Sequence, residues 1–373
     1  MRVIVVGAGL VGASVALSLR RAGADVVVIE RGIPGAEASH AAGGILSPQA
    51  ECDVDGPLLQ LCLRGLAATR RLCRSLVEDD ADQGRVLGLR EAGTLDVAFD
   101  AATLKTLEAR VAWQHALGLQ AEMLDGDGCR AQAPGLSRAV IGGAWFKDEA
   151  SLDPRLLYDE LRRAGDRAGV AVVRALVDEV TATTVVVRDG GARTLDADAV
   201  VVCAGAWTPQ VRGVAVTEDV IFPVRGQIVC VQQQVSPAKA FSCVVYGAAG
   251  YVVPRSDGRV LCGSTMERVG FAKATTPAGL ARIGTMLASL MPDLAETPVV
   301  DSWSGLRPAT TDGLPLLGQE ASGVWLASGH FRNGVLLAAI SGDLLASALL
   351  RGEPIPAAFS PQRTSADVRS GVL

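Results

Sequence analysis

The first thirty residues constrain the fold of this chain more than any other segment. A β-branched run over residues 3–6 leads into Gly7, Gly9 and Gly12, which are spaced as G-x-G-x-x-G. A helical stretch follows, and then a second β-branched run that ends in Glu30. Gly7 permits a tight turn, Gly9 lets the backbone approach a pyrophosphate, and Gly12 lets helix and strand pack closely. The segment therefore predicts a strand–helix–strand unit that binds a dinucleotide.

The residues around these glycines indicate which dinucleotide fits. The helix begins after Gly9, so the free N–H groups near Leu10 and Val11 would face the phosphates. An acidic residue at the end of the second strand accepts hydrogen bonds from a ribose hydroxyl, whereas a 2′-phosphate needs a basic one. Glu30 therefore favours NAD or FAD over NADP, although Arg31 beside it is basic.

Composition and charge argue against several classes of protein. The 373 residues are 49% hydrophobic and only 20% charged, which predicts a sizeable core and argues against a disordered chain. The net charge of −5 and the lack of a lysine or arginine run argue against nucleic-acid binding. At this length we expect two domains, or one α/β domain with an inserted part.

Cysteine and histidine usage predicts a reduced protein without a metal site. The eight cysteines form no C-x-x-C pair and there are only three histidines, so we expect buried thiols in a cytoplasmic protein. The longest apolar run, residues 335–350, contains Asp343 and is short for a bilayer span. We therefore expect a soluble protein without stable membrane insertion.

Strand and helix patterns continue along the chain. Helices are predicted over residues 58–77, 101–117, 155–168, 277–291 and 334–350. Strands are predicted over residues 171–173, 185–188, 199–202, 221–231 and 324–327, and residues 251–262 resemble an antiparallel hairpin. This order predicts an α/β nucleotide fold built from three separate segments, with a second, sheet-rich domain between them. The tail after Arg351 is expected to be peripheral.

Three later segments resemble one family of flavoproteins. Residues 38–46 (ASHAAGGIL) resemble the flavin-contacting loop of the D-amino-acid-oxidase-like flavoproteins. Residues 304–315 (SGLRPATTDGLP) resemble their substrate-carboxylate motif, and residues 329–337 (GHFRNGVLL) resemble the loop and helix start that close over the flavin. With the hairpin and residues 263–267 (GSTME), they are most similar to the glycine oxidases of the thiamine-biosynthesis type. The resemblance runs from residue 1 to about residue 350.

The resemblance implies a fold and a cofactor. It implies a Rossmann-type FAD-binding domain, discontinuous in sequence, over residues 1–80, 148–218 and 302–373. The inserted substrate-binding domain, built on a largely antiparallel sheet, is expected over residues 81–147 and 219–301. Related enzymes that tether FAD use a cysteine near the carboxylate motif, and residues 303–312 contain none. We therefore expect noncovalent FAD.

The expected cofactor contacts come from the opening unit and from the resemblance together. They are Gly7, Gly9, Leu10, Val11, Gly12, Glu30, Arg31, Ser39, His40, Ala42, Gly43, Gly44, Ile45, Val177, Ala204, Gly205, Trp207, Arg307, His330, Arg332, Asn333, Gly334, Val335 and Leu336.

A carboxylate substrate needs a fixed cation, and Arg307 is expected to supply it. Arginine binds a carboxylate with two parallel hydrogen bonds and does not lose its proton. Arg307 lies in a segment bracketed by glycine and proline, which suits a rigid loop. The alternative for Arg307 is an ordinary surface ion pair. By resemblance, Tyr251 would hydrogen-bond the same carboxylate; its alternative is an interface aromatic with a hydrated hydroxyl.

Three more residues complete the expected substrate pocket. Met266 would line its small end, or else only fill the core. Arg332 would hold the substrate or the pyrimidine end of the flavin, and Ile45 would limit the size of the substrate. Backbone N–H groups from Asn333 to Leu336 would stabilise negative charge on a reduced flavin, because they lie at a helix start.

The resemblance implies an FAD-dependent amino-acid oxidase. Glycine is the expected substrate, with sarcosine and small D-amino acids next, oxidised by hydride transfer from Cα to an imine. From glycine the products would be glyoxylate, ammonia and H2O2, with O2 as the acceptor. No protein acid or base is implied, so His330 is expected only as a flavin contact.

Other activities and an assembly are also implied. The alternatives are a D-amino-acid dehydrogenase or a secondary-amine oxidase on the same scaffold and, more remotely, a non-catalytic FAD-binding subunit. The resemblance further implies a role in thiamine thiazole synthesis and a homo-oligomer such as a tetramer.

Overall fold

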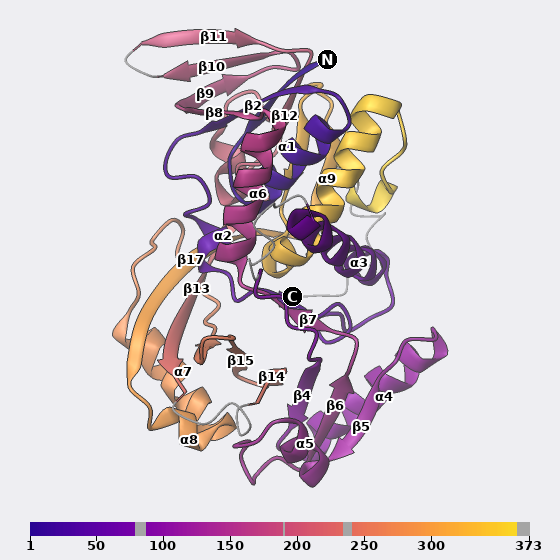
Figure 1. The fold of residues 1–373 in the computed structure, drawn as a ribbon, viewed down its shortest axis with the longest axis vertical. Coiled ribbons are helices and arrows are strands. Elements are labelled where there is room, and N and C mark those ends of the chain that lie inside the picture. Colours follow the sequence, from indigo (N-terminus) through magenta and orange to yellow (C-terminus); the bar gives the residue numbers. More distant parts are fainter. Residues whose placement is uncertain (79–86, 189–190, 234–240, 364–373) are drawn as a thin grey trace.

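The computed structural model describes residues 1–78, 87–188, 191–233 and 241–363. Its two largest sheets have six and eight strands. The six-stranded sheet lies in the upper part of Figure 1 with the long helices α1, α6 and α9 beside it, and the eight-stranded sheet lies below.

The six-stranded sheet is built around the strand predicted from the first residues. In spatial order its strands are β18 (Leu316–Gln319), β19 (Trp325–Ser328), β12 (Ala199–Val202), β1 (Arg2–Val6), β2 (Asp25–Glu30) and β8 (Ala171–Arg174). Adjacent strands are parallel except for β18 and β19. Val3 and Val5 of β1 and the three valines of β12 have no exposed surface, as central strands covered on both faces require. This is the Rossmann-type arrangement expected from the sequence, and segments far apart in the chain build it.

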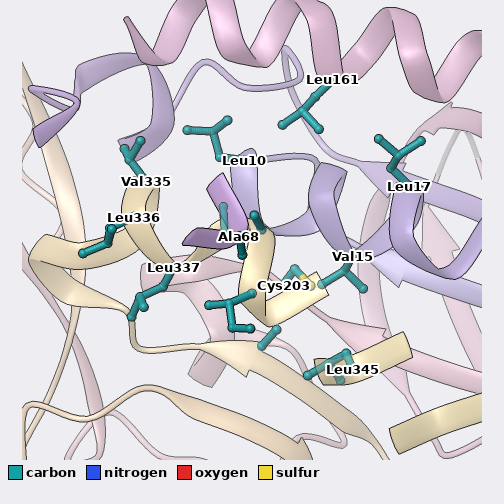
Figure 2. Packing of buried hydrophobic residues seen from close by; sticks show 14 of the residues in the cluster. Leu10, Val15, Leu17, Ala68, Leu161, Cys203, Val335, Leu336, Leu337 and Leu345 are labelled. Carbon is teal, nitrogen blue, oxygen red and sulfur yellow. The ribbon is translucent and has the colours of Figure 1, made fainter. Parts of the chain in front are cut away.

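Four helices pack beside this sheet. They are α1 (Leu10–Arg21), α3 (Pro57–Glu78), α6 (Pro154–Ala168) and α9 (Gly334–Arg351). Helix α1 contacts both α6 and α9, and Figure 2 shows side chains of the three helices, such as Leu10, Leu161 and Val335, in one buried cluster. Gly342 permits the close approach of α9 to α1, because a Cβ there would lie only 2.7 Å from the Ser14 carbonyl oxygen.

Helix α9 is the most apolar of these helices. Among the described residues, the segment Phe331–Arg351 has the length and composition to cross a bilayer, and 61% of its most apolar stretch is buried inside the protein. Its apolar residues pack on α1 and α3, so the core accounts for its composition.

The eight-stranded sheet is largely antiparallel. In spatial order its strands are β17 (Val299–Thr310), β13 (Ile221–Gln232), β16 (Arg259–Gly263), β15 (Gly250–Pro254), β14 (Val244–Gly247), β4 (Thr94–Ala98), β6 (Gly142–Phe146) and β5 (Glu122–Asp125). The pairing of β14 with β4 is parallel. Helices α4 (Ala101–Ala116), α5 (Gly126–Gln132), α7 (Pro277–Leu290) and α8 (Pro292–Ala295) accompany this sheet. Apolar residues of α7, such as Ile283 and Leu287, pack on valines of the sheet to form a second core.

Shorter elements complete the fold. A two-stranded sheet pairs β3 (Ile45–Leu46) with β7 (Ala150–Ser151), and helix α2 (Ala38–Ala41) precedes it. A three-stranded sheet consists of β9 (Leu176–Val180), β10 (Thr184–Arg188) and β11 (Ala192–Asp196). Single 3-10 turns lie at Gly205–Gln210, Phe331–Asn333 and Ala357–Phe359.

The segment around Arg307 differs from the rigid loop expected. It belongs to β17, which pairs with β13 along nearly its whole length. Pro308, which suggested the loop, faces Pro223 of β13 across this pair. The strand can hold Pro308 because β17 lies at the sheet edge, where proline is tolerated. The domain boundary expected at residue 302 falls inside β17, and the two-domain division remains a prediction.

The structure describes the tail after Arg351 up to residue 363, and there the tail is anchored, which differs from the peripheral tail expected. The Arg363 side chain is 4% exposed and donates to both carboxylate oxygens of Asp312, at 2.7 and 2.8 Å. It also donates to the carbonyl oxygens of Leu314 and Pro315. Tail and turn are far apart in sequence, so no local pattern indicated this contact.

Candidate active site

A cavity of about 1090 Å3 runs between the two large sheets. Most of the predicted site residues line it: Gly7, Gly9, Leu10, Val11, Glu30, Arg31, Ser39, Ala42, Gly43, Gly44, Ile45, Val177, Ala204, Gly205, Trp207, Tyr251, Met266, Arg307, His330, Arg332, Asn333, Gly334 and Val335. The structure therefore brings together residues from four distant parts of the chain, within residues 7–45, 177–207, 251–266 and 307–335.

Three predicted residues do not line the cavity. Gly12 lies behind the glycine turn, where a Cβ would be 1.9 Å from the Gly7 carbonyl oxygen, so its role is close packing of helix and strand. Leu336 is buried in the core. His40 is exposed, and its carbonyl oxygen accepts a hydrogen bond from Arg155 at 3.2 Å. His40 and Leu336 therefore do not contact a ligand with their side chains in this arrangement.

The N-terminus of α1 opens into one end of the cavity. The Leu10 N–H donates to Ser39 Oγ at 2.8 Å, which holds the loop after β2 against the helix start. The Glu30 carboxylate accepts the N–H groups of Ala8 and Gly32, each at 2.9 Å. These contacts fix the acid at the end of β2 beside the glycine turn, as a ribose contact requires.

Arg31 and Trp207 form a wall at the same end. The guanidinium carbon of Arg31 lies 4.1 Å from the centre of the Trp207 ring, and its Nη2 lies 3.5 Å from the Glu37 carboxylate. Phe271 lies near the same indole, at a ring-centre distance of 5.5 Å. Because stacking and an ion pair already engage Arg31, its position beside Glu30 does not favour NADP.

The start of α9 faces the cavity as well. Phe331 has a positive φ of 46°, and the chain then turns so that Asn333, Gly334 and Val335 line the cavity. The Asn333 side chain makes no capping hydrogen bond. The first N–H groups of this 18-residue helix are therefore available to an acceptor in the cavity.

His330 is buried beneath this helix start. Its Nε2 lies 2.9 Å from Ser341 Oγ. Burial lowers the pKa of the His330 imidazole to about 4, so the ring is neutral near pH 7. A neutral ring held by Ser341 suits a packing contact.

Arg307 carries the free positive charge of the cavity. Its Nη2 donates to Ser264 Oγ at 2.6 Å and its Nη1 donates to the Thr265 carbonyl oxygen at 3.2 Å. Among the described residues no carboxylate lies within ion-pair distance of Arg307, so the surface ion pair considered as its alternative is not formed. A half-buried guanidinium without a counter-ion is suited to bind an anion.

Tyr251, Met266 and Ile45 surround the same part of the cavity. The Tyr251 phenol lies near the backbone of Gly43, and its ring packs edge-on against Tyr246 at 5.7 Å between ring centres. Ile45 packs with both tyrosines. Met266 is 57% exposed and lines the cavity, so it is not core filler.

Arg332 is not a free cation. Its Nη2 donates to Glu51 Oε1 at 2.9 Å, and Tyr246 also donates its hydroxyl to that oxygen. The Glu51 carboxylate raises the pKa of the Arg332 guanidinium, and burial and this carboxylate raise that of the Tyr246 phenol. Glu51 and Tyr246 were not among the predicted site residues. They lie far from Arg332 in sequence, and nothing in their local sequence distinguishes them.

The chain matches one family of known proteins over most of its length. The family model described as "FAD dependent oxidoreductase" (DAO) matches residues 2–348. The chain belongs to this family. It is a flavoprotein oxidoreductase that uses FAD, and the resemblance seen in the sequence is confirmed.

Relatives of this flavoprotein are similar over nearly its whole length. It is 33% identical, over 97% of its residues, to the bifunctional protein ThiO/ThiG of Synechocystis sp., and it spans about half (54%) of that relative. It is 30% identical to the glycine oxidase of Geobacillus kaustophilus, over 94% of this chain and 93% of that one. The crystal structure of glycine oxidase from Geobacillus kaustophilus matches with a TM-score of 0.89 at 29% identity, covering 97% and 99% of the two chains.

The residues present in the flavoprotein fit FAD. A Cβ at Gly7 would lie 2.6 Å from the Cys203 carbonyl oxygen, so only a glycine with its φ of +103° forms the narrow turn beneath the helix. The N-termini of α1 and α9 both open onto the cavity, which would suit the pyrophosphate of FAD and the negative charge of a reduced flavin. Cys203 lines the cavity, but burial raises the pKa of its thiol to about 12, so it stays protonated.

Proposed function

We propose that this flavoprotein oxidises the amine of a small amino acid, with glycine as the first candidate and sarcosine and small D-amino acids next. In the reaction the Cα–H bond breaks, hydride leaves with the electron pair, and the nitrogen lone pair forms the C=N bond of a protonated imine. Water then converts the imine from glycine to glyoxylate and ammonia. When bound, FAD supplies the hydride acceptor, and O2 takes the two electrons to give H2O2.

The observation that carries this proposal is the unpaired guanidinium of Arg307 in the cavity. A carboxylate held there by two parallel hydrogen bonds has a fixed orientation, and its Cα is then fixed as well. The Tyr251 phenol makes no hydrogen bond to another described residue, so it is free to donate to the same carboxylate.

The proposed step needs no proton acceptor from the protein. A neutral amine already has the lone pair that forms the C=N bond, so no proton leaves with the hydride. His330 is held by Ser341, and the Glu51 carboxylate is engaged by Arg332 and Tyr246. These residues therefore orient and pack in our proposal, and the amine must arrive without its extra proton.

The walls of the pocket favour a small substrate. Ile45, Tyr246 and Tyr251 pack together on one side, and Met266 lines the cavity nearby. One methylene in such an apolar pocket changes discrimination by only about 1–3 kcal/mol. Glycine, sarcosine and D-alanine are therefore compared directly in the test.

The test is anaerobic bleaching of the flavin by glycine, sarcosine, D-alanine, D-proline and larger D-amino acids. We expect the small substrates to bleach it fastest. Arg307→Lys should lower kcat/KM roughly 30-fold, about 2 kcal/mol, because lysine cannot bind a carboxylate with a planar fork. Unchanged bleaching in the variant would remove Arg307 from its assigned role.

The same panel separates the other activities on this scaffold. A secondary-amine oxidase would be bleached faster by sarcosine or proline than by glycine. A dehydrogenase would give little peroxide in air, and a non-catalytic subunit would be bleached by no amine. A role in thiamine thiazole synthesis, a homo-oligomeric assembly and a cytoplasmic location remain predictions from the resemblance and from cysteine usage.

A further inference from the structure

Gly226 lies buried in the middle of β13, directly under the guanidinium of Arg307. A Cβ at this position would lie 2.1 Å from Arg307 Nη1, 2.2 Å from Nη2 and 2.3 Å from the guanidinium carbon. These are the three nearest atoms, and all belong to the same planar group. The guanidinium therefore lies flat on backbone that carries no side chain.

The backbone itself does not require glycine at position 226. The φ angle of Gly226 does not lie in the left-handed region. Gly226 pairs with Gly305 in the regular antiparallel register of β13 and β17. An alanine can adopt this backbone without strain. What Gly226 provides is space, and Arg307 fills that space.

If a Cβ were added at position 226, the side chain of Arg307 would move and the strand would not. The overlapping atoms are the end of a long, flexible side chain, whereas the Cβ would be fixed to a central strand. Moving the guanidinium would also strain its hydrogen bonds to Ser264 and Thr265. An added methyl group therefore displaces the carboxylate-binding group while leaving the sheet in place.

We propose that Gly226 is a positioning residue that sets where the substrate carboxylate binds, acting through Arg307. Arginine has five N–H donors, and Ser264 and Thr265 take two of them, which leaves three without a partner among the described residues. Because the plane of the fork lies on Gly226, those donors are presented in one fixed plane. The inference rests on the proposed function, since it assigns the anion at Arg307 to a substrate carboxylate.

The test uses Gly226→Ala in the FAD-loaded protein, with glycolate as probe. Glycolate has the shape of glycine but no amine, and its binding is followed by the change in flavin absorbance. We expect the Kd of glycolate and the KM of glycine to rise at least about tenfold, with a much smaller change in kcat. FAD content and Tm should stay near the wild-type values.

A double-mutant cycle identifies the route of the effect. In an Arg307→Ala background, Gly226→Ala should weaken glycolate binding no further, because the group it displaces is gone. Equal losses in both backgrounds would overturn the proposal, as would wild-type glycolate affinity in Gly226→Ala. If Gly226→Ala alone fails to fold, the double variant with Arg307→Ala should still fold. A double variant that also unfolds would show that the backbone itself needs glycine at position 226, and this would overturn the proposal.

Gly284→Ala is the matched control. Gly284 lies in α7, and a Cβ there would meet no atom within 4 Å. This variant should bind glycolate and oxidise glycine as the wild type does. If no amine bleaches the wild-type flavin while glycolate still binds in a way that depends on Arg307 and Gly226, the positioning role stands and amine oxidation is wrong.

Discussion

At the scale of single residues, His330 is a buried imidazole whose effect on the free energy of unfolding depends on pH. Its folded-state pKa of about 4 is below the ordinary value of 6.5. Between these values the unfolded chain binds more protons, so stability is fully present above pH 6.5 and is lost as pH falls towards 4. We expect His330 to contribute about 3 kcal/mol to this loss.

The measurement is the free energy of urea unfolding of the FAD-loaded protein between pH 4 and 7. His330→Asn should show a shallower fall with decreasing pH than the wild type. His115→Asn, which alters an exposed histidine, is the control for the loss of an imidazole. An unchanged slope in His330→Asn would mean that the imidazole is not held neutral.

The sequence indicated single residues only where the signal was local. Gly7, Gly9 and Glu30 follow a pattern contained in thirty residues, and the structure places them on one end of the cavity. Glu51 gave no signal, because its partners Arg332 and Tyr246 are distant in sequence. Gly226 was not singled out either, because a glycine inside a strand pattern indicates close approach by another group but not which group.

At the scale of elements, the ion pair of Arg363 with Asp312, here called the Arg363 clamp, joins the tail to the turn between β17 and β18. Its side chain is 4% exposed and that of Asp312 is 25% exposed, so the pair is mostly shielded from water. Arg363→Ala should lower the free energy of unfolding by about 2–4 kcal/mol, slightly below the range for fully buried pairs because Asp312 is partly exposed. Chemical unfolding of the FAD-loaded protein measures this loss.

Arg351→Ala is the control for the clamp. Arg351 also pairs with an acidic residue, Glu353, but both side chains are more than half exposed. Exposed pairs contribute little, so this variant should unfold like the wild type. Equal effects of the two substitutions would show that the tail does not stabilise the turn.

Most elements could be predicted because periodicity and capping are local. Helix α6 has its N-cap at Asp153 and ends at Gly169 in the left-handed region, as the sequence indicates. The strand character of β17 was missed because its stability comes from pairing with β13, some eighty residues earlier. Proline and glycine in that segment outweighed a pairing that no local window contains.

At the scale of the whole molecule, FAD should stabilise both sheets together. The cavity is lined by β1, β2 and β19 on one side and by β13, β15 and β17 on the other. Free FAD at 100 times its Kd should add about 2.7 kcal/mol to the free energy of unfolding, and each further tenfold about 1.4 kcal/mol. Thermal unfolding at increasing FAD concentrations measures this, and a Tm independent of FAD would contradict the assigned site.

At the scale of the whole molecule, the order of strands and helices along the sequence predicted the overall arrangement, whereas the domain boundaries stay predictions. Alternating strands and helices identified a nucleotide fold assembled from separate segments, and the two large sheets agree with it. The boundary expected at residue 302 lies inside β17, a strand of the eight-stranded sheet, and the division into two domains stays a prediction.

The packing of α9 on α1 also imposes an order on biosynthesis. The first helix emerges from the ribosome early, but α9, whose start forms the other end of the cofactor cavity, is made more than three hundred residues later. Strand β1 likewise lacks its partner strand β12 until β12 has been translated. A nascent chain therefore cannot complete its flavin cavity until α9 has been translated, and the early βαβ unit must stay competent to fold until then.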